Sequence, residues 1–344
     1  MSTPQPLLQV TDLHKHFPIK EGVLIERKVG EVRAVDGVSF DVQPGETLSL
    51  VGESGSGKST TGYCVLQLMK PTSGSVKFEG TELTELGREE LRRMRREMQI
   101  VFQDPMTSLN PTLTIGTQIT ETVRRHYDVS QKQADKKAVE LLEKVRIPRA
   151  AERLKDYPHR FSGGMRQRVM IAIALSCDPK LLIADAPTTA LDVTVQASVL
   201  DLLDDLRHEY DMSMIIITHD MGVVAEAADD IIVMYAGQVV EHASTLDLFD
   251  NPEHPYTEAL LGALPQLEGA NLRQGRLTAI PGRPPDLHDP PKACRFAPRC
   301  RYAGNDDCTE HEPELREIRP AHWVRSAHPA SERAKTVAPQ TVGS

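Results

Sequence analysis

A glycine-rich segment near the N-terminus has the residue types and spacing of a phosphate-binding loop. Residues 52–59 match the pattern G-x-x-x-x-G-K-[ST], and they stand between an apolar run at 47–51 and a helical pattern that starts at Ser59. The glycines let consecutive backbone N–H groups turn toward one anion, and the helix N-terminus adds its positive end. Lys58 supplies a charge for the β- and γ-phosphates, and Ser59 supplies a hydroxyl for Mg²⁺. We therefore expect a nucleoside triphosphate site here.

A second glycine-containing segment also precedes a helix. Ser162 can cap the helix predicted over 163–175, and Gly163 and Gly164 allow close backbone approach. This helix start is a second candidate for anion binding in the same chain. One nucleotide cannot easily need both sites, so the second site requires a separate explanation.

Two polar residues follow strands that the sequence predicts. Asp185 comes directly after the apolar run 181–184, and His219 follows the strand predicted over 214–218. A parallel sheet presents the carboxyl ends of its strands beside the phosphate loop. Asp185 is therefore a candidate to hold magnesium through its hydration shell, and His219 a candidate to reach a γ-phosphate. Each assignment depends on the other motifs, because many strands end in Asp and most histidines have no such role.

Strands and helices alternate over most of the chain, which indicates an α/β fold with a mostly parallel sheet. In the helix predicted over 131–147, Val139, Leu142 and Val145 are expected to face inward. Frequent prolines after residue 245 mark a smaller appended unit, and the residues from Ala330 are expected to form a disordered tail. The other predicted elements are strands at 33–40, 47–51, 180–184 and 214–218 and helices at 59–69, 88–98, 163–175 and 195–210.

Composition limits the classes of function. The chain has 344 residues, which suits about two domains, and its 40 basic and 49 acidic residues give a formal charge of −9. That charge argues against broad binding to nucleic acid or anionic lipid. We find no secretion-signal pattern, and no apolar run approaches the roughly 20 residues that cross a bilayer, so a membrane role would need a partner. Five unevenly placed cysteines agree with a reducing compartment.

Taken together, these motifs resemble those of the ATP-binding cassette (ABC) ATPases, and the resemblance covers roughly residues 7–328. By resemblance, Gln103 matches the Q-loop glutamine, 162–165 the signature, Asp185 the Walker B aspartate and His219 the switch histidine. Ala190, Leu191 and Asp192 match the D-loop, and Phe17 resembles the aromatic residue that stacks on adenine, although a packing role for it is nearly as plausible. The Walker A loop corresponds to Gly52, Glu53, Ser54, Gly55, Ser56, Gly57, Lys58, Ser59 and Thr60.

The resemblance implies a fold and a way of using both anion sites. It implies an α/β P-loop nucleotide-binding domain over 7–250, with a mostly parallel sheet, an antiparallel β subdomain and a helical signature subdomain at about 105–175. In that family two cassettes face head to tail, so each ATP lies between one chain's Walker A loop and the other's signature, which here includes Ser162, Gly163 and Gly164. Ser59, Gln103 and Asp185 are the implied magnesium residues. Asp192 is implied to contact ATP.

More narrowly, the chain resembles the ATP-binding subunits of dipeptide and oligopeptide importers. The segments 161–169, 187–196 and 254–257 carry this resemblance, and 251–329 looks like the C-terminal extension of that group. The implied partners are a second, similar cassette in a heterodimer, two membrane-spanning permease subunits and, indirectly, an extracytoplasmic peptide-binding protein. The implied place is the cytoplasmic face of the membrane, with no nucleic-acid partner. The transported solute, whether dipeptide, longer peptide or nickel chelate, is read by those partners.

One position departs from the pattern of an active cassette. The residue after the Walker B aspartate is normally the glutamate that polarises the attacking water, and here it is Ala186. A methyl group cannot accept a proton, so we expect this chain to bind MgATP and to hydrolyse it poorly. Three explanations compete: a natural degenerate site in a heterodimer, a substitution made to trap ATP, or rescue by another residue such as His219. The matching flanking residues favour the substitution.

The cysteines of the extension are the second departure. Cys294, Cys300 and Cys308 are closely spaced thiols that suit a [4Fe–4S] cluster or zinc. Related chains carry a fourth cysteine in a later segment, where this chain has Ser326. The fourth ligand would then be Ser326, His322, His328 or water. Three reduced cysteines in a loop-rich cap explain the pattern equally well.

Two other functions compete with a transport ATPase. Ala186 is compatible with a nucleotide-gated regulatory subunit, in which ATP binding alone does the work. A soluble cassette ATPase acting on nucleic acid or ribosomes is the second alternative. That class should show a long coiled-coil or zinc insertion, or tandem cassettes, and the sequence shows none of these. The sequence therefore favours transport.

Overall fold

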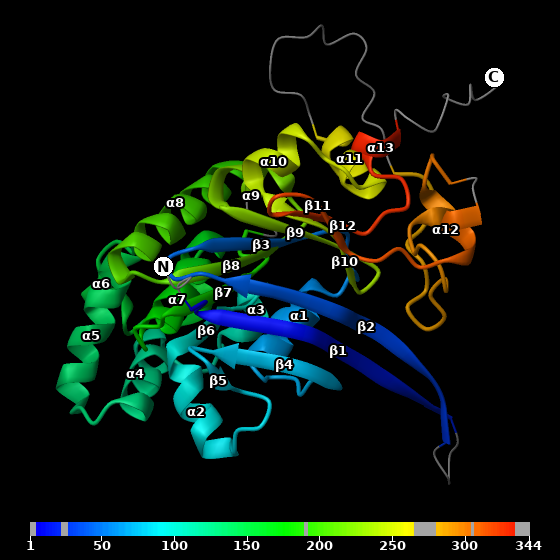
Figure 1. Ribbon diagram of the computed structural model, residues 1–344. Helices are drawn as coiled ribbons and strands as arrows, with labels where there is room; N and C mark the ends of the chain where they lie inside the picture. The colour runs from blue at the N-terminus through cyan, green and yellow to red at the C-terminus, as the bar shows by residue number, and fades with distance from the viewer. Residues whose placement is uncertain (1–4, 22–26, 189–191, 265–279, 304–305, 334–344) are drawn as a thin grey trace, which may run out of the picture.

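The computed structural model describes residues 5–21, 27–188, 192–264, 280–303 and 306–333. The main sheet has eight strands and lies at the centre of the molecule (Figure 1). The strand order is β11-β12-β10-β9-β3-β8-β7-β6, and the five strands from β9 to β6 run parallel. The parallel strands are β3 (Thr47–Val51), β6 (Met98–Val101), β7 (Leu181–Asp185), β8 (Ser213–Thr218) and β9 (Asp230–Tyr235). The antiparallel strands are β10 (Gln238–Ser244), β11 (Arg316–Arg319) and β12 (His322–Val324).

The central strands are buried on both faces, as their apolar sequences require. Every residue of β3, β7 and β8 is buried, because helices cover both faces of the sheet. The covering helices include α1 (Lys58–Val65), α7 (Gly163–Leu175), α8 (Val193–Tyr210) and α9 (Met221–Ala227). The α/β class and the mostly parallel sheet expected from the alternating pattern are confirmed.

Helix α1 is shorter than the sequence predicted. It ends at Val65 rather than at residue 69, because Gln67 adopts a left-handed conformation with φ of 54°. The side chain of Arg95 donates to the carbonyl oxygens of Leu66, at 2.9 Å, and of Gln67. These bonds satisfy carbonyls that the helix end leaves open.

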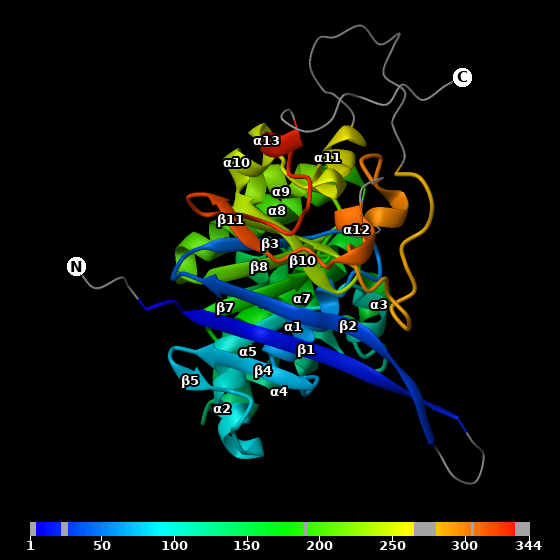
Figure 2. The same cartoon turned by 45° about the vertical axis from the view of Figure 1, so that its right-hand side comes forward.

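A second, antiparallel sheet lies beside the first, as the family resemblance implied. Its strand order is β2-β1-β4-β5, and β1 and β2 form a long hairpin that extends away from the body of the molecule (Figure 2). The sequence predicted a strand at 33–40, and the structure has the much longer β2 paired along β1. The strands are β1 (Leu8–Glu21), β2 (Arg27–Val42), β4 (Ser73–Phe78) and β5 (Thr81–Glu82), and α2 (Arg88–Glu97) follows them.

Residues 105–175 are mostly helical, and their apolar side chains belong to a core cluster that is shared with the main sheet and α8. Ile115, Ile119 and Val123 recur at helical spacing and are buried against Leu142 and Val145. Leu142 and Val145 face inward as predicted, and Val139 is half-buried. The elements are α3 (Pro105–Ser108), α4 (Ile115–His126), α5 (Gln131–Lys144), α6 (Ala150–Arg153), a 3₁₀ turn η1 (Pro158–Arg160) and α7.

The C-terminal extension continues the main sheet. Its strands β12 and β11 add to the edge strand β10, so the extension and the cassette share one sheet (Figure 1). The tail expected from Ala330 onward is wrong for its first four residues, which form α13 (Ala330–Arg333), because Arg333 pairs with Glu258. Residues 334–344 lie outside the described residues. The remaining elements are α10 (Thr245–Asp250), α11 (Pro255–Gly262), the 3₁₀ turn η2 (Ala297–Arg299) and α12 (Asp306–Glu310).

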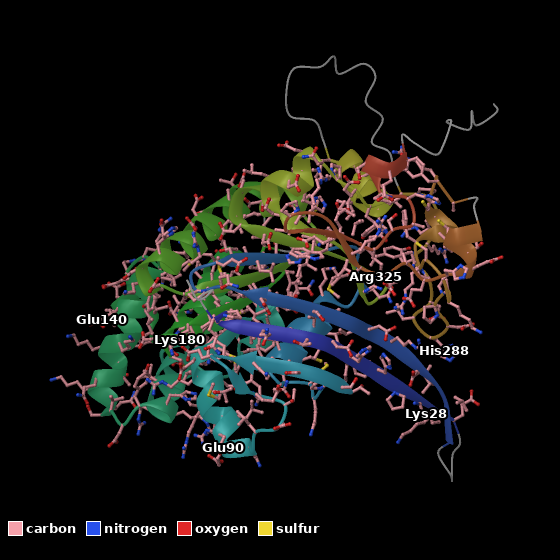
Figure 3. All side chains as sticks on the ribbon, in the orientation of Figure 1. Lys28, Glu90, Glu140, Lys180, His288 and Arg325 are labelled. Atoms are coloured by element: carbon pink, nitrogen blue, oxygen red, sulfur yellow. The ribbon has the colours of Figure 1, made fainter. Side chains whose placement is uncertain are left out.

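Charged side chains are distributed as this packing predicts. Glu90, Glu140 and Lys180 lie on the outside of the molecule, whereas Arg325 lies between the extension and the sheet (Figure 3). Arg325 donates from its side chain to the carbonyl oxygens of Val239, at 3.0 Å, and Pro313, at 3.2 Å. Across the part of the chain that the structure describes, no helix has the length and apolar character needed to cross a bilayer.

Candidate nucleotide site

The loop between β3 and α1 is shaped by glycines that have no room for a side chain. Gly52 and Gly57 have φ of 146° and 103°, a region that disfavours residues with a Cβ. A Cβ on Gly57 would lie 2.1 Å from the carbonyl oxygen of Ala34, and one on Gly52 would lie 2.2 Å from that of Met234. The loop therefore packs directly against the backbone of β2 and β9.

Lys58 is buried beneath this loop. Its ammonium group donates to the carbonyl oxygens of Gly52, at 2.7 Å, and Glu53, at 2.8 Å, and to the hydroxyl of Ser56, at 3.3 Å. All three acceptors are uncharged. Burial lowers the pKa of Lys58 to about 8, against the opposing effect of the nearby carboxylates of Asp185 and Glu53. A buried cation with these partners favours an incoming anion.

Ser59 and Asp185 meet where the start of α1 faces the end of β7. The hydroxyl of Ser59 donates to Oδ1 of Asp185 at 2.8 Å, and the hydroxyl of Tyr63 donates to Oδ2 at 2.9 Å. Burial and the charge and hydrogen bond of Asp185 raise the pKa of Tyr63 to about 12, so this phenol stays protonated. A hydroxyl and a carboxylate form the oxygen-rich donor set that Mg²⁺ prefers.

A pocket of ≈ 330 Å³ opens beside these groups. Gln103, Ala186 and His219, which come from three separate segments, all line it. Ala186 has φ of 47°, and its N–H donates to the carbonyl oxygen of Ile217 at 2.7 Å. The other residues that line the pocket are Ala34, Ser54, Gly55, Gly57, Lys58, Ser59, Thr60, Asp185, Ile217 and Thr218.

Several residues expected at the site do not line this pocket. Gly52 packs against the backbone of Met234, and the hydroxyl of Ser56 accepts a hydrogen bond from Lys58. Ser162 and Gly163 are exposed at the start of α7, where the hydroxyl of Ser162 accepts the N–H of Met165 at 3.3 Å. Gly164 is half-buried, and a Cβ there would lie 2.5 Å from Val195.

Asp192 of the D-loop segment and the adenine-stacking candidate Phe17 also do not line this pocket. Ala190 and Leu191 fall outside the described residues, and Asp192 is exposed and caps α8 by accepting the N–H of Val195 at 2.9 Å. Phe17 is exposed on β1, and the ammonium of Lys15 lies 5.0 Å from the centre of its ring.

The extension touches the phosphate loop, a contact that sequence reasoning missed. Arg299 forms two hydrogen bonds to the carboxylate of Glu53, at 2.6 and 3.0 Å. The backbone N–H of Glu53 donates to the hydroxyl of Tyr256 at 2.8 Å. Tyr256 is fully buried, and its ring lies 4.6 Å from that of Tyr235 and 5.4 Å from that of Phe296. The available signal was the segment 254–257, which marked the resemblance but had no assigned role.

The cysteines of the extension do not come together as a metal site. Among the described residues, the sulfur atoms of Cys294, Cys300 and Cys308 do not form a group in which all potential ligand atoms lie within 4.8 Å of one another. Burial raises the pKa of the Cys294 and Cys300 thiols, which favours the neutral form. An iron–sulfur or zinc site at these cysteines is therefore not supported.

Two of the three side chains considered as a fourth ligand, His322 and Ser326, are engaged elsewhere, whereas Nε2 of buried His328 has no hydrogen-bond partner among the described residues. Buried His322 lies between the carboxylates of Glu241, at 2.8 Å, and Asp247, at 2.5 Å, and so uses both ring nitrogens. The hydroxyl of Ser326 accepts the backbone N–H of His328 at 3.0 Å. The extension is thus held by hydrogen bonds and ion pairs in this region.

Comparisons with known proteins agree with this geometry. Residues 35–189 match the ABC transporter family, and residues 240–308 match the family described as oligopeptide/dipeptide transporter, C-terminal region. The chain is 52% identical to the oligopeptide transport ATP-binding protein OppD of Bacillus subtilis (strain 168), over 86% of this chain and 84% of that protein. It is 48% identical to the dipeptide transport ATP-binding protein DppD of the same organism, over 86% and 87%.

Solved structures give the same answer for the fold. The ATP-binding cassette MJ0796, solved as a dimer in a post-hydrolysis state bound to ADP and phosphate, superposes with a TM-score of 0.62 at 29% identity. The match covers 69% of this chain and 98% of that one. This chain therefore belongs to the ATP-binding subunits of ABC transporters, within the group that carries the oligopeptide/dipeptide transporter C-terminal region.

Proposed function

We propose that this chain binds ATP with Mg²⁺ and couples it to peptide import through membrane-spanning partners. The observation that carries the proposal is the meeting of Lys58, Ser59, Asp185, Gln103 and His219 around one pocket, although they come from distant parts of the sequence. Relatives at about half identity are named as oligopeptide and dipeptide transport ATP-binding proteins, which supports a peptide as the transported solute.

The residues present fit ATP and magnesium. Gly55 and Gly57 leave backbone N–H groups open to the phosphates, and Lys58 exchanges uncharged acceptors for the β- and γ-phosphate oxygens. Ser59, Asp185 and Gln103 would hold Mg²⁺, which when bound stabilises the charge that develops on the phosphate oxygens. His219 lies across the pocket, where it can donate to the γ-phosphate.

The exposed start of α7 supports a partner cassette. Ser162 and Gly163 lie at the surface rather than in the pocket of their own chain, so they are available to an ATP held by another cassette. We infer a head-to-tail dimer with a second, similar cassette, bound to two permease subunits at the cytoplasmic face of a membrane. A peptide-binding protein on the other side would deliver the solute.

Position 186 sets the expected rate of hydrolysis. Ala186 lines the pocket next to Asp185, where a carboxylate could reach the attacking water, and its methyl group can neither take a proton nor orient water. The site is therefore expected to bind ATP well and to hydrolyse it slowly. This same observation favours a second candidate, a subunit in which ATP binding alone gates the complex.

Transport by the assembled complex tests the proposal and separates it from the alternative. The complex is reconstituted in proteoliposomes with its binding protein, and ATP-dependent uptake of peptide and release of phosphate are measured together. Uptake that needs Lys58 and stops with Lys58→Ala supports the proposal. Uptake that proceeds with ATP bound at this site but never hydrolysed there favours the gating subunit. Absence of any peptide uptake in a complex that hydrolyses ATP would overturn the peptide assignment.

A further inference from the structure

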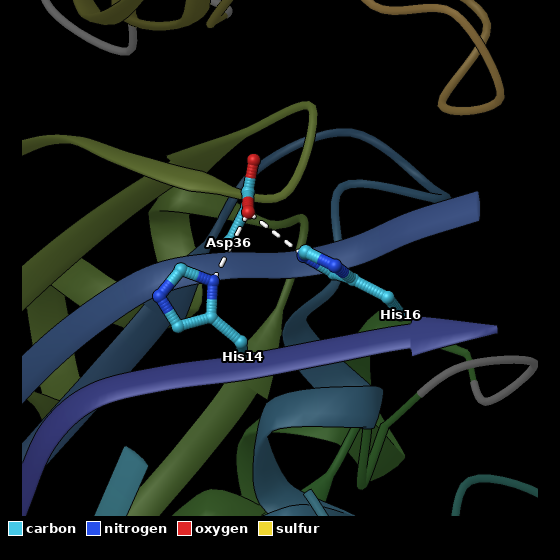
Figure 4. A group of neighbouring side chains, drawn as sticks. All are labelled: His14, His16 and Asp36. Atoms are coloured by element: carbon cyan, nitrogen blue, oxygen red, sulfur yellow. Dashed lines mark hydrogen bonds and ion pairs between the residues drawn. The ribbon is translucent and has the colours of Figure 1, made fainter. Parts of the chain in front are cut away.

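The long hairpin of β1 and β2 carries a cluster of potential metal ligands outside the nucleotide pocket. His14 and His16 are two residues apart on β1, where the pairing with β2 is irregular, and both rings are turned toward Asp36 (Figure 4). Asp36 on β2 is the direct cross-strand partner of His14. The Nδ1 atom of His14 lies 3.1 Å from Oδ1 of Asp36, and Nε2 of His16 lies 2.8 Å from the same oxygen (Figure 4). These three atoms all lie within 4.8 Å of one another.

The second nitrogen of each histidine faces another carboxylate. Nε2 of His14 lies 2.9 Å from Asp12, and Nδ1 of His16 lies 3.4 Å from Glu31. Histidines that bind metal nearly always donate their other ring N–H to such an oxygen, which fixes the tautomer and orients the ring. An ordinary ion pair between a histidine and an aspartate does not require a second carboxylate facing the other ring nitrogen, as is found here for both histidines.

Asp36 is held in place before any ligand arrives. Its backbone N–H donates to the carbonyl oxygen of Gly237 at 2.8 Å, and its Oδ2 pairs with the buried guanidinium of Arg295. Burial works to raise the pKa of Asp36, but hydrogen bonds from Arg295, His16 and His14 hold it at about 2. Asp36 is therefore a carboxylate at neutral pH, and its Oδ1 is turned toward the two histidines.

We propose that His14, His16 and Asp36 bind a divalent transition-metal ion of the zinc class. Two imidazole nitrogens and one carboxylate oxygen suit Zn²⁺, with a fourth position left for water. Tetrahedral bonds of about 2.0–2.1 Å would place neighbouring ligand atoms roughly 3.3 Å apart. The two separations from Oδ1 of Asp36, 3.1 and 2.8 Å, need to open by only a few tenths of an ångström, and the two histidine nitrogens already lie within 4.8 Å of each other. In the metal-bound form, Nδ1 of His14 and Nε2 of His16 carry no proton, and the opposite nitrogens carry the N–H groups that face Asp12 and Glu31.

The charged side chains around the cluster affect its affinity for a metal ion in opposite directions. Arg295 and Arg33 lie near Asp36 and oppose a further positive charge, while Asp12, Glu31 and Asp36 favour it. None of the three ligands lines the nucleotide pocket, so the proposal stands independently of the proposed function.

Cobalt titration of untagged protein without nucleotide tests the site, because Co²⁺ replaces Zn²⁺ and absorbs visible light in a tetrahedral field. We expect one equivalent of Co²⁺ per chain with visible absorption and without the near-ultraviolet band of a thiolate ligand. His14→Ala and His16→Ala should each weaken binding by more than tenfold, and Asp12→Asn by about ten- to a hundredfold. Asp36 is left unchanged because it also anchors Arg295.

Two variants serve as controls. His242→Ala removes a histidine of similar exposure that pairs with Asp230 at 2.7 Å but belongs to no three-ligand group among the described residues, and cobalt binding should be unchanged. Cys300→Ser should also leave the signal intact. His14→Gln preserves side-chain bulk, and with an unchanged thermal midpoint it distinguishes ligand loss from misfolding. Absence of stoichiometric binding, or binding that survives both His14→Gln and His16→Ala, would show that the cluster only joins β1 to β2.

Discussion

Two helices of this chain begin at glycine-containing segments, and their surroundings differ. The loop before α1 is enclosed: Gly52 and Gly57 pack against the backbone, and Lys58 is buried. The start of α7 is open, with Ser162 and Gly163 at the surface. The first forms a pocket within one chain, whereas the second presents a helix N-terminus outward. Two similar local sequences therefore have different surroundings, and the tertiary structure makes that difference.

The largest expected effect comes from completing the enclosed site. In a complex with an active partner cassette, Ala186→Glu should raise phosphate release at this site by roughly 10²- to 10⁴-fold, because a positioned general base contributes about that much. ATP affinity should change little. Residue 186 already carries a Cβ at φ of 47°, so the substitution adds no new backbone strain.

The measurement requires a silent second site. The partner's own Walker glutamate is removed, and phosphate release and trapped nucleotide are followed side by side. The alanine form should accumulate a closed dimer that holds ATP. If the glutamate form is no faster, another group acts as the base or this site is not hydrolytic.

Removing the buried ammonium group of Lys58 tests whether the enclosed loop before α1 binds ATP. Lys58→Ala should weaken ATP binding by about 10- to 150-fold, since hydrogen bonds to charged groups contribute about 1.5–3 kcal/mol. Calorimetry on the isolated chain measures this directly. Equal affinities for the two forms would contradict the role of the loop.

Because Lys58 loses its charge as the pH rises, we expect ATP affinity to fall with increasing pH. Burial lowers the pKa of Lys58 to about 8, so the charged fraction of this side chain falls as pH rises through that value. ATP affinity should decrease by up to about tenfold between pH 7 and pH 9. Tyr63, with its pKa raised to about 12, stays neutral over this range. Lys58→Ala should bind ATP with a flat profile, and a slope that persists in that variant would assign the titration to another group.

The extension provides a smaller test of how the enclosed site is held. Arg299→Ala leaves Glu53 without its partner, and it should lower stability by about 1.5–3 kcal/mol and ATP affinity by several-fold. Thermal unfolding and calorimetry measure the two effects. Arg301→Ala removes an exposed arginine that pairs with Glu258 and should change neither. ATP affinity unaffected by Arg299→Ala would mean that the extension does not support the loop.

The open helix start should show the smallest effect on the isolated chain. Gly163→Asp places a side chain and a negative charge where a partner's nucleotide would approach, yet ATP affinity of the single chain should stay within about twofold. In the assembled dimer, the same variant should stop hydrolysis at the partner's Walker site. A large loss of ATP affinity in the isolated chain would place the signature inside its own pocket and reverse the comparison.

The sequence predicted the candidate nucleotide site because the chemistry of its phosphate loop is local. The order of glycines, Lys58 and Ser59 is readable from adjacent residues, and the apolar runs ending at Asp185 and near His219 indicate parallel strands whose ends meet. Helix α7 and strand β8 follow from periodicity and apolar content in the same way.

Contacts between residues that are far apart in the sequence could be seen only in the tertiary structure. The contact of Arg299 with Glu53 spans 246 residues, and the cluster of His14, His16 and Asp36 depends on the pairing register of two strands. The carbonyls left open at the early end of α1 are satisfied by Arg95, and α13 is held by the pairing of its Arg333 with Glu258. Local patterns carry no information about which distant side chain will supply a charge, because that choice is made when the sheet and its extension pack together.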